Sequence, residues 1–194
     1  MVTNAPDARP DLACGERFRI KSRRGTDYVV TFLHRERNGD GMYVRLSDRR
    51  IARLNDDRVR WSTYARVSQE GEPLVAPGDQ ILVEMPSRSI RGKLAEEIVG
   101  DEIVIRRPSG RVIRVPRAMV VAFSLLFPAQ NLTVGDRFMV QSKSGNQYRG
   151  VVTALPGRDR ATVTLDDGRE MKLRLERVDF RTLFVPVPVP LHEL

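Results

Sequence analysis

GDRFMVQSKSGNQYRGVVTALPGRDRATVTLDDGREMKLRLERVDF, residues 135–180, is a series of short segments in which apolar and polar side chains alternate. Alternation with a period of two residues is typical of strands that bury one face. The turns KSGNQ, PGRD and DDG separate these segments, and their Gly, Pro, Asn and Asp residues favour tight reversals of the chain. The stretch therefore predicts five short antiparallel strands.

Two more divergent copies of this pattern precede it. Each copy opens on a glycine followed by an acidic residue, and the opening recurs after 63 and then 57 residues. Tyr28 and Tyr148 are separated by the same number of residues as Gly15 and Gly135. The other aligned positions are Phe18, Ile81 and Phe138 in the first strand, and Val59, Val120 and Val178 in the last. A repeat of this length with five strands a copy predicts three small all-β domains in tandem.

Five bent strands in so few residues predict a closed barrel, since a short open sheet would leave two bare edges. The third copy, with Tyr148-Arg149-Gly150 after a basic turn and V-T-L before an acidic-glycine turn, resembles the C-terminal barrel of the bacterial ribosome maturation factor P family. The second copy, with Ile90-Arg91-Gly92, is similar, and KOW, Tudor-like and Sm-like domains share the plan. The resemblance implies three tandem SH3-like five-stranded barrels. It implies no binding residues, because the copies have neither the KOW glycine signature nor a Tudor-type aromatic cage.

The domain boundaries follow from the repeat. The expected parts are a disordered lead at 1–11, barrels at 12–70, 71–128 and 129–185, and a proline-rich tail at 186–194. The tail alternates valine with proline, which cannot donate ladder hydrogen bonds, so we expect an extended arm or a segment that caps a sheet edge. The short connections at 65–77 and 127–134 predict barrels that pack on one another, with the apolar run 118–127 as a buried closing strand.

The charge balance favours a polyanionic partner. The chain has 33 Lys and Arg against 25 Asp and Glu, a net charge of +8. An arginine-rich coding composition would produce the same balance. The N-terminus has no apolar run of the signal-peptide kind, and the longest apolar stretch is too short to span a bilayer. With Cys14 as its single cysteine, the chain is expected in the reducing cytoplasm, without a membrane partner.

No catalytic or cofactor-binding constellation is visible. His34, His192 and Cys14 have no convergent partners for a metal site or a nucleophile. Paired acids such as Asp56-Asp57 and Asp166-Asp167 fall in turns, where aspartate is favoured for local hydrogen bonding. We therefore expect a protein that is not an enzyme and binds no cofactor or metal.

The first copy holds most of the excess charge. Residues 11–70 have 14 basic and 9 acidic residues, whereas residues 129–194 are nearly balanced at 10 and 8. Successive outward side chains of one strand lie roughly 6–7 Å apart, close to the phosphate repeat of a nucleic-acid strand. The residues expected to contact nucleic acid here are Arg17, Arg19, Lys21, Arg23, Arg24, Tyr43 and Arg45. Tyr28, Trp61 and Tyr64 would stack on bases if exposed, although a place in the core is the favoured interpretation for Tyr28 and Trp61.

A second arginine cluster lies in a predicted hairpin of the second copy. Its members are Arg106, Arg107, Arg111, Arg114 and Arg117, with no acidic residue between 103 and 135. It would form a second basic ridge for phosphate contacts, and a solvated hairpin face explains it equally well.

Together these features predict a non-enzymatic, sequence-nonspecific binder of DNA or RNA that holds the phosphate backbone with arginines. The alternative is an interaction scaffold whose strand edges and grooves bind a protein partner.

Overall fold

The structure, a computed structural model, describes residues 9–36, 39–68, 73–129, 132–157 and 159–194. Within these ranges the chain is all-β, with fifteen strands, four single-turn 3-10 helices and no α-helix. The first copy consists of β1 (Arg17–Ser22), β2 (Asp27–Arg35), β3 (Gly41–Leu46), β4 (Ile51–Asn55), η1 (Asp56–Arg58) and β5 (Val59–Arg66).

The second and third copies repeat this series of elements. The second consists of β6 (Gln80–Met85), β7 (Arg88–Leu94), β8 (Glu102–Arg106), β9 (Val112–Pro116), η2 (Arg117–Met119) and β10 (Ala122–Pro128). The third consists of β11 (Arg137–Ser142), β12 (Gln147–Ala154), β13 (Arg160–Leu165), β14 (Glu170–Arg174), η3 (Leu175–Arg177) and β15 (Val178–Val189), followed by η4 (Leu191–Glu193).

The strands form two antiparallel sheets. One has five strands in the order β4-β3-β2-β1-β5, and the other has ten in the order β14-β13-β12-β11-β15-β10-β6-β7-β8-β9. In every copy the first four strands are sequential neighbours, and the fifth lies on the free side of the first. The 3-10 turn between the fourth and fifth strands reverses the chain so that it reaches that side.

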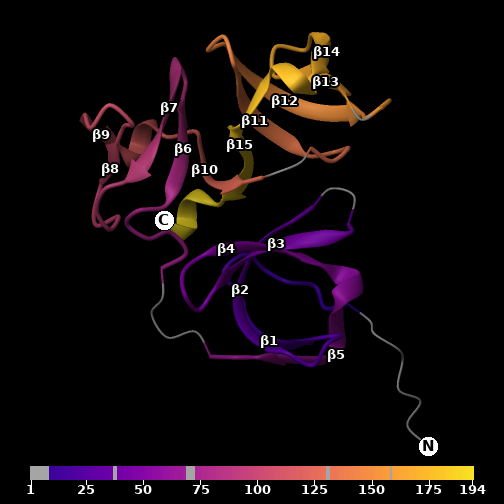
Figure 1. Cartoon of the computed structure of the whole chain (residues 1–194). Coiled ribbons are helices and arrows are strands. Elements are labelled where there is room, and N and C mark those ends of the chain that lie inside the picture. The colour runs from indigo at the N-terminus through magenta and orange to yellow at the C-terminus, as the bar shows by residue number, and fades with distance from the viewer. Residues whose placement is uncertain (1–8, 37–38, 69–72, 130–131, 158) are drawn as a thin grey trace, which may run out of the picture. The chain divides into compact units, whose positions relative to one another are not determined.

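The predicted closure into barrels is wrong, because neither sheet closes. In the first sheet β5 pairs with β1 only, so β4 and β5 remain the two edges. A register shift between Arg19 and Lys21 on β1 bends the strand where it pairs with β5. The strands therefore curl around a common interior (Figure 1), and side-chain packing closes the curl in place of a hydrogen-bonded seam.

The alternation predicted for the first strand is confirmed. Phe18 and Ile20 are 0% and 1% exposed and join the buried cluster of the first copy, whereas Arg19 and Lys21 face solvent. Trp61 is also in this cluster, so the reading of Trp61 as a core residue is confirmed. The third copy builds an equivalent cluster around Phe138, Val152 and Val163.

The chain divides into two compact units, one reaching Leu125 and including Pro188–Leu194, and the other covering Leu126–Val187. The division into three domains stays a prediction. The apolar run 118–127 does form a buried strand, since Phe123 and Leu125 in β10 are 1% and 0% exposed. The first part of the predicted tail continues β15 as far as Val189, and Val187 and Val189 are buried there. Most of the predicted lead and parts of both connections lie outside the described residues.

Candidate nucleic-acid interface

The outer face of β1 carries the predicted basic stripe. Arg19 and Lys21 are exposed and Arg17 is half-buried, on the side opposite Phe18 and Ile20. The neighbouring strand extends the stripe, because Lys21 lies opposite the exposed Arg60 of β5. The Lys21 ammonium is 3.7 Å from the Asp27 carboxylate, and both side chains are about half exposed. A surface ion pair of this kind contributes little to stability, so it holds Lys21 only weakly.

A groove of about 840 Å³ opens at the end of this stripe. Its apolar floor is formed by Ile20, Leu54 and Val59, with the ring of Tyr28 beside them. Its other lining residues are polar or charged: Ser22, Arg23, Arg24, Thr26, Arg53, Asn55, Asp57 and Arg58. A groove with an apolar floor and a cationic rim suits a ligand that has both a flat apolar part and a negative charge.

Backbone hydrogen bonds hold the two walls of the groove together. The turn after β1 is closed by the bonds from Ser22 N to Thr26 O (2.8 Å) and from Gly25 N to Ser22 O (2.9 Å). Arg23 N then donates to Arg58 O at 2.8 Å, which joins this turn to η1. The side chains of Arg23, Arg24 and Arg58 therefore project from a rigid backbone frame.

Ion pairing separates the arginines of the first copy into two groups. Arg35, Arg45, Arg50, Arg53 and Arg66 each pair with a carboxylate, and the Arg53–Glu36 pair is bidentate. The cations without a carboxylate partner in the described part of the chain are Arg17, Arg19, Arg23, Arg24, Arg49, Arg58 and Arg60. Apart from Arg49, all of them lie on β1, on the first residues after it, or on η1 and β5. The uncompensated charge of this copy is therefore concentrated along β1 and around the groove.

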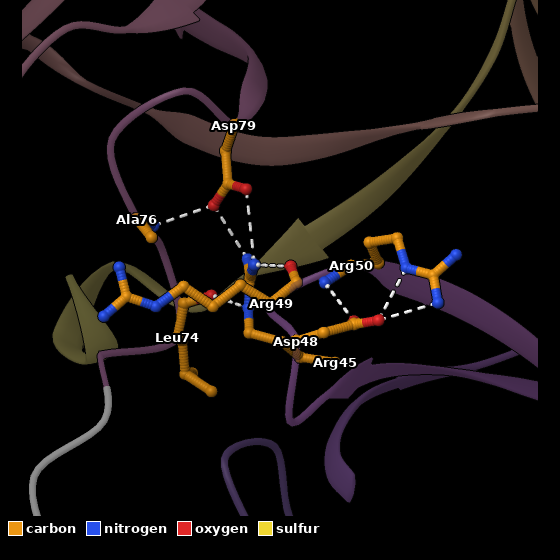
Figure 2. A network of polar contacts seen from close by, with 7 residues as sticks. All are labelled: Arg45, Asp48, Arg49, Arg50, Leu74, Ala76 and Asp79. Carbon is orange, nitrogen blue, oxygen red and sulfur yellow. Dashed lines mark hydrogen bonds and ion pairs between the residues drawn. The ribbon is translucent and has the colours of Figure 1, made fainter.

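Two of the predicted contact residues are buried, since Tyr43 and Arg45 are only 3% and 4% exposed. Arg45 donates to the carbonyl oxygens of Leu74 (2.8 Å) and Arg49 (2.7 Å), and to the carboxylate of Asp79 (2.8 Å), as Figure 2 shows. The alternation failed here because β3 is buried on both faces. An arginine on the outward side of β3 therefore compensates an acid from the second copy.

The predicted ridge in the second copy divides into parts with different partners. Arg106, Arg107 and Arg111 are exposed at the tip of the β8–β9 hairpin. Arg114 pairs with Glu102 at 3.3 Å, and Arg117 is half-buried and donates to the carbonyl oxygens of Gly100 and Leu191.

Acidic residues that directly precede position 103 explain why Arg114 is paired whereas, among the residues that the structure describes, the tip arginines are not. Antiparallel pairing places Arg114 opposite Val104, so that Glu102 and the residues before it approach the hairpin. A hollow of about 470 Å³ beside Arg114 is lined by Glu96, Glu97, Asp101 and Glu102. Only the tip of the predicted ridge is therefore a basic surface.

The aromatic residues of the first copy have different environments. Tyr28 is half-buried and lines the groove, so part of its ring is accessible there. Tyr64 packs on Phe18 with ring centroids 5.5 Å apart, and its hydroxyl donates to the Glu16 carboxylate. Glu16 also accepts from the Arg66 guanidinium at 2.9 and 3.0 Å. These bonds, the Arg66 bond first, lower the pKa of Glu16 to about 2 and join the start of β1 to the end of β5.

The environment of the single cysteine, Cys14, does not favour a reactive thiolate. Burial, and to a smaller extent the charge of Glu193, raises the pKa of the Cys14 thiol to about 11. The thiol is therefore protonated at neutral pH, whereas a cysteine nucleophile requires the thiolate.

Over the described ranges, His, Cys, Asp and Glu side chains do not gather in groups of three that could hold a metal ion. No helix in those ranges is long and apolar enough to cross a membrane. Comparison of the sequence with protein-family models and with curated proteins finds no match.

Proposed function

We propose that this protein binds nucleic acid without sequence preference and without catalysis. The supporting observation is the set of cations that have no carboxylate partner, which begins on β1 and ends in a groove containing Tyr28. Arginine is well suited to this role, because its planar guanidinium donates two parallel hydrogen bonds to a phosphate.

The expected contacts are mainly with the phosphate backbone. Each phosphate that the protein neutralises adds roughly 0.9 to the slope of log affinity against log salt for duplex DNA, and roughly 0.7 for single strands. Substituting three contacting arginines should therefore reduce that slope by about 2–3. An exposed arginine that is already paired with a carboxylate should contribute much less.

A salt titration of the full-length protein with fluorescently labelled DNA and RNA, read as anisotropy, tests this proposal. The test variant carries Arg19→Ala, Arg23→Ala and Arg24→Ala. The control carries Arg50→Ala, Arg169→Ala and Arg181→Ala, which remove the same charge. Each control arginine is exposed and pairs with the aspartate two residues before it. Equal losses in the two variants, or no binding by the unmodified protein at low salt, would contradict the proposal.

The open sheet edges support a second candidate, a scaffold that binds a protein partner. In the first sheet neither β4 nor β5 pairs with a further strand, and an unpaired edge is a template for adding a peptide strand. Such binding would depend on backbone hydrogen bonds and would resist salt. Capture of a folded partner at high salt, together with the absence of nucleic-acid binding, would favour this candidate.

We also propose that the three copies are SH3-like domains and that the protein acts in the cytoplasm. The shared strand order and the 3-10 turn before each fifth strand support the first statement. Limited proteolysis of the full chain tests it, with first cleavages expected in 65–77 and 127–134. Fractionation of the producing cells tests the second statement.

A further inference from the structure

A second groove in the third copy has the same construction as the first. Its volume is about 560 Å³, and it opens between the turn after β11 and the end of β14 with η3. Its lining residues are Ser142, Lys143, Ser144, Asn146, Tyr148, Met171, Lys172, Leu173, Arg174, Glu176, Arg177 and Val178.

The two grooves use equivalent positions of the repeat. A shift of 120 residues relates β1 and its turn to β11 and its turn, and a shift of 119 relates β4 and η1 to β14 and η3. With these shifts, eleven of the twelve residues that line each groove coincide. Two compact units therefore each form the same hollow at the same place in the repeat.

The backbone frame is also repeated bond for bond. The bond from Ser22 N to Thr26 O at 2.8 Å recurs from Ser142 N to Asn146 O at 2.8 Å. The bond that joins the turn to the 3-10 helix, 2.8 Å long in the first copy, recurs from Lys143 N to Arg177 O at 3.0 Å. The turn and the wall of each groove are thus fixed before any ligand arrives.

The chemistry of the two linings agrees although many of the residues differ. Each lining contains one tyrosine, four cations and one acid: Tyr28, Arg23, Arg24, Arg53, Arg58 and Asp57 in the first, and Tyr148, Lys143, Lys172, Arg174, Arg177 and Glu176 in the third. The first copy has a cation at Arg24 and a neutral Asn55, whereas the third has a neutral Ser144 and a cation at Arg174. The two linings therefore have the same number of cationic and acidic side chains, although Arg53 of the first is paired with Glu36.

The second copy differs from the other two at the positions that form this groove. Its β6–β7 turn contains only Pro86 and Ser87, compared with the four residues Arg23–Thr26 in the first copy. At the tyrosine position stands Ile90, which is 1% exposed and faces Val83 across the ladder, as Tyr148 faces Val140. The strand order by itself therefore places neither a tyrosine nor a four-residue turn at this position.

We infer that the two grooves are equivalent binding sites for single-stranded nucleic acid, each taking a base against its tyrosine and a phosphate on its cationic rim. This inference rests on the proposed function. Stacking on an aromatic ring requires an unpaired base, so the grooves select single strands, whereas the outer face of β1 contacts phosphates of either form. Their volumes lie within the range of about 300–1,000 Å³ typical of ligand sites.

Calorimetric titration of the full-length protein with a thymidine hexanucleotide tests the inference. We expect two sites per chain, and one after either Tyr28→Ala or Tyr148→Ala, whereas Tyr28→Phe and Tyr148→Phe should keep both sites. Both tyrosines pack against buried clusters, so their replacement by alanine could also disturb the fold. Arg58→Gln and Arg177→Gln are therefore tested as well, because these two arginines are exposed. Each glutamine variant should weaken its own site by about tenfold, since it removes a charge-assisted contact. Arg50→Gln is the control and should leave both sites unchanged.

The outcomes separate this inference from the proposed function. A stoichiometry of one, equal affinity for a hexamer duplex, or groove variants that bind the hexanucleotide like the unmodified protein would overturn the inference. If long DNA or RNA still binds and that binding depends on Arg19 and Arg23, the proposed function survives. Failure of the unmodified protein to bind any nucleic acid at low salt would overturn both.

Discussion

The ion pair between Arg45 and Asp79 should contribute far more stability than surface pairs of similar length. The side chains of Arg45 and Asp79 are 5% and 15% exposed, and their closest atoms, Nη2 and Oδ2, are 2.8 Å apart. The exposed pair Arg50–Asp48 has a separation of 2.7 Å, with side chains 77% and 50% exposed. The perturbation is Asp79→Asn, which removes the negative charge and leaves the shape of the side chain.

Burial determines the expected magnitude. Removing one partner of a buried pair typically costs about 3–5 kcal/mol, because the remaining charge stays desolvated. The carbonyl oxygens of Leu74 and Arg49 still accept from Arg45, and an asparagine can replace some of the lost acceptors. We therefore expect a value near the lower end, a loss of about 3 kcal/mol in the free energy of unfolding. Asp48→Asn, the matched control, should leave the unfolding midpoint unchanged within error.

Urea unfolding followed by tryptophan fluorescence measures both variants. The single tryptophan, Trp61, is 5% exposed in the core of the first copy and reports on the unit that contains both pairs. A further variant that combines Arg45→Met with Asp79→Asn should be more stable than Asp79→Asn alone, because no uncompensated guanidinium remains buried. If Asp79→Asn and Asp48→Asn shift the midpoint equally, burial does not set the value of the Arg45–Asp79 pair and the reasoning is refuted.

Three further predictions concern packing and titration. Gly150→Ala would place a Cβ 2.1 Å from the carbonyl oxygen of Thr164, so β12 and β13 must separate and the melting temperature should fall, at a cost of about 2–4 kcal/mol. The exposed Gly157→Ala, whose nearest contact would be 3.4 Å, should melt like the unmodified protein. Because the pKa of Glu16 is lowered from 4.5 to about 2, its stabilising effect is complete above about pH 4.5 and is lost as the pH falls towards 2. In Glu16→Gln, the free energy of unfolding measured in urea should therefore change less with pH over that interval. With its pKa raised to about 11, Cys14 should react with iodoacetamide more slowly at pH 8 in the folded protein than in urea; equal rates would contradict this.

Local patterning was sufficient to predict the strands and the repeat. Phe18 and Ile20 alternate with Arg19 and Lys21 because one side of β1 faces the core and the other faces water, so burial leaves a direct trace in the sequence. The same rule failed for Tyr43 and Arg45, since β3 is covered on both faces and alternation carries no information there. Closure failed for a related reason: it depends on which edges pair, and pairing between distant strands leaves no periodic signal.

The candidate site was predicted only in part. Arg23 and Arg24 follow β1 directly and were expected to bind, whereas Arg58 reaches the groove from η1, more than thirty residues later. The sequence predicts no contact residue in the third copy, whose overall charge is nearly balanced, although four of its cations line one groove. Tyr28 and Tyr148 occupy the same position of the repeat, and so do Arg58 and Arg177, which directly precede the aligned Val59 and Val178. These two matches were the signal that could have located both grooves.

The sequence by itself determined that this chain is all-β, repeats one five-stranded pattern and concentrates positive charge in its first copy. Those properties depend on periodicity, turn residues and composition, which act over a few neighbouring residues. Only the tertiary structure decided which arginines are compensated, that the sheets stay open and that two copies form the same cationic groove. Apart from local pairs such as Arg50 with Asp48, these properties depend on residues far apart in the chain, such as Arg45 with Asp79 or Arg23 with Arg58. The charge of a linear window does not reveal such distant partners.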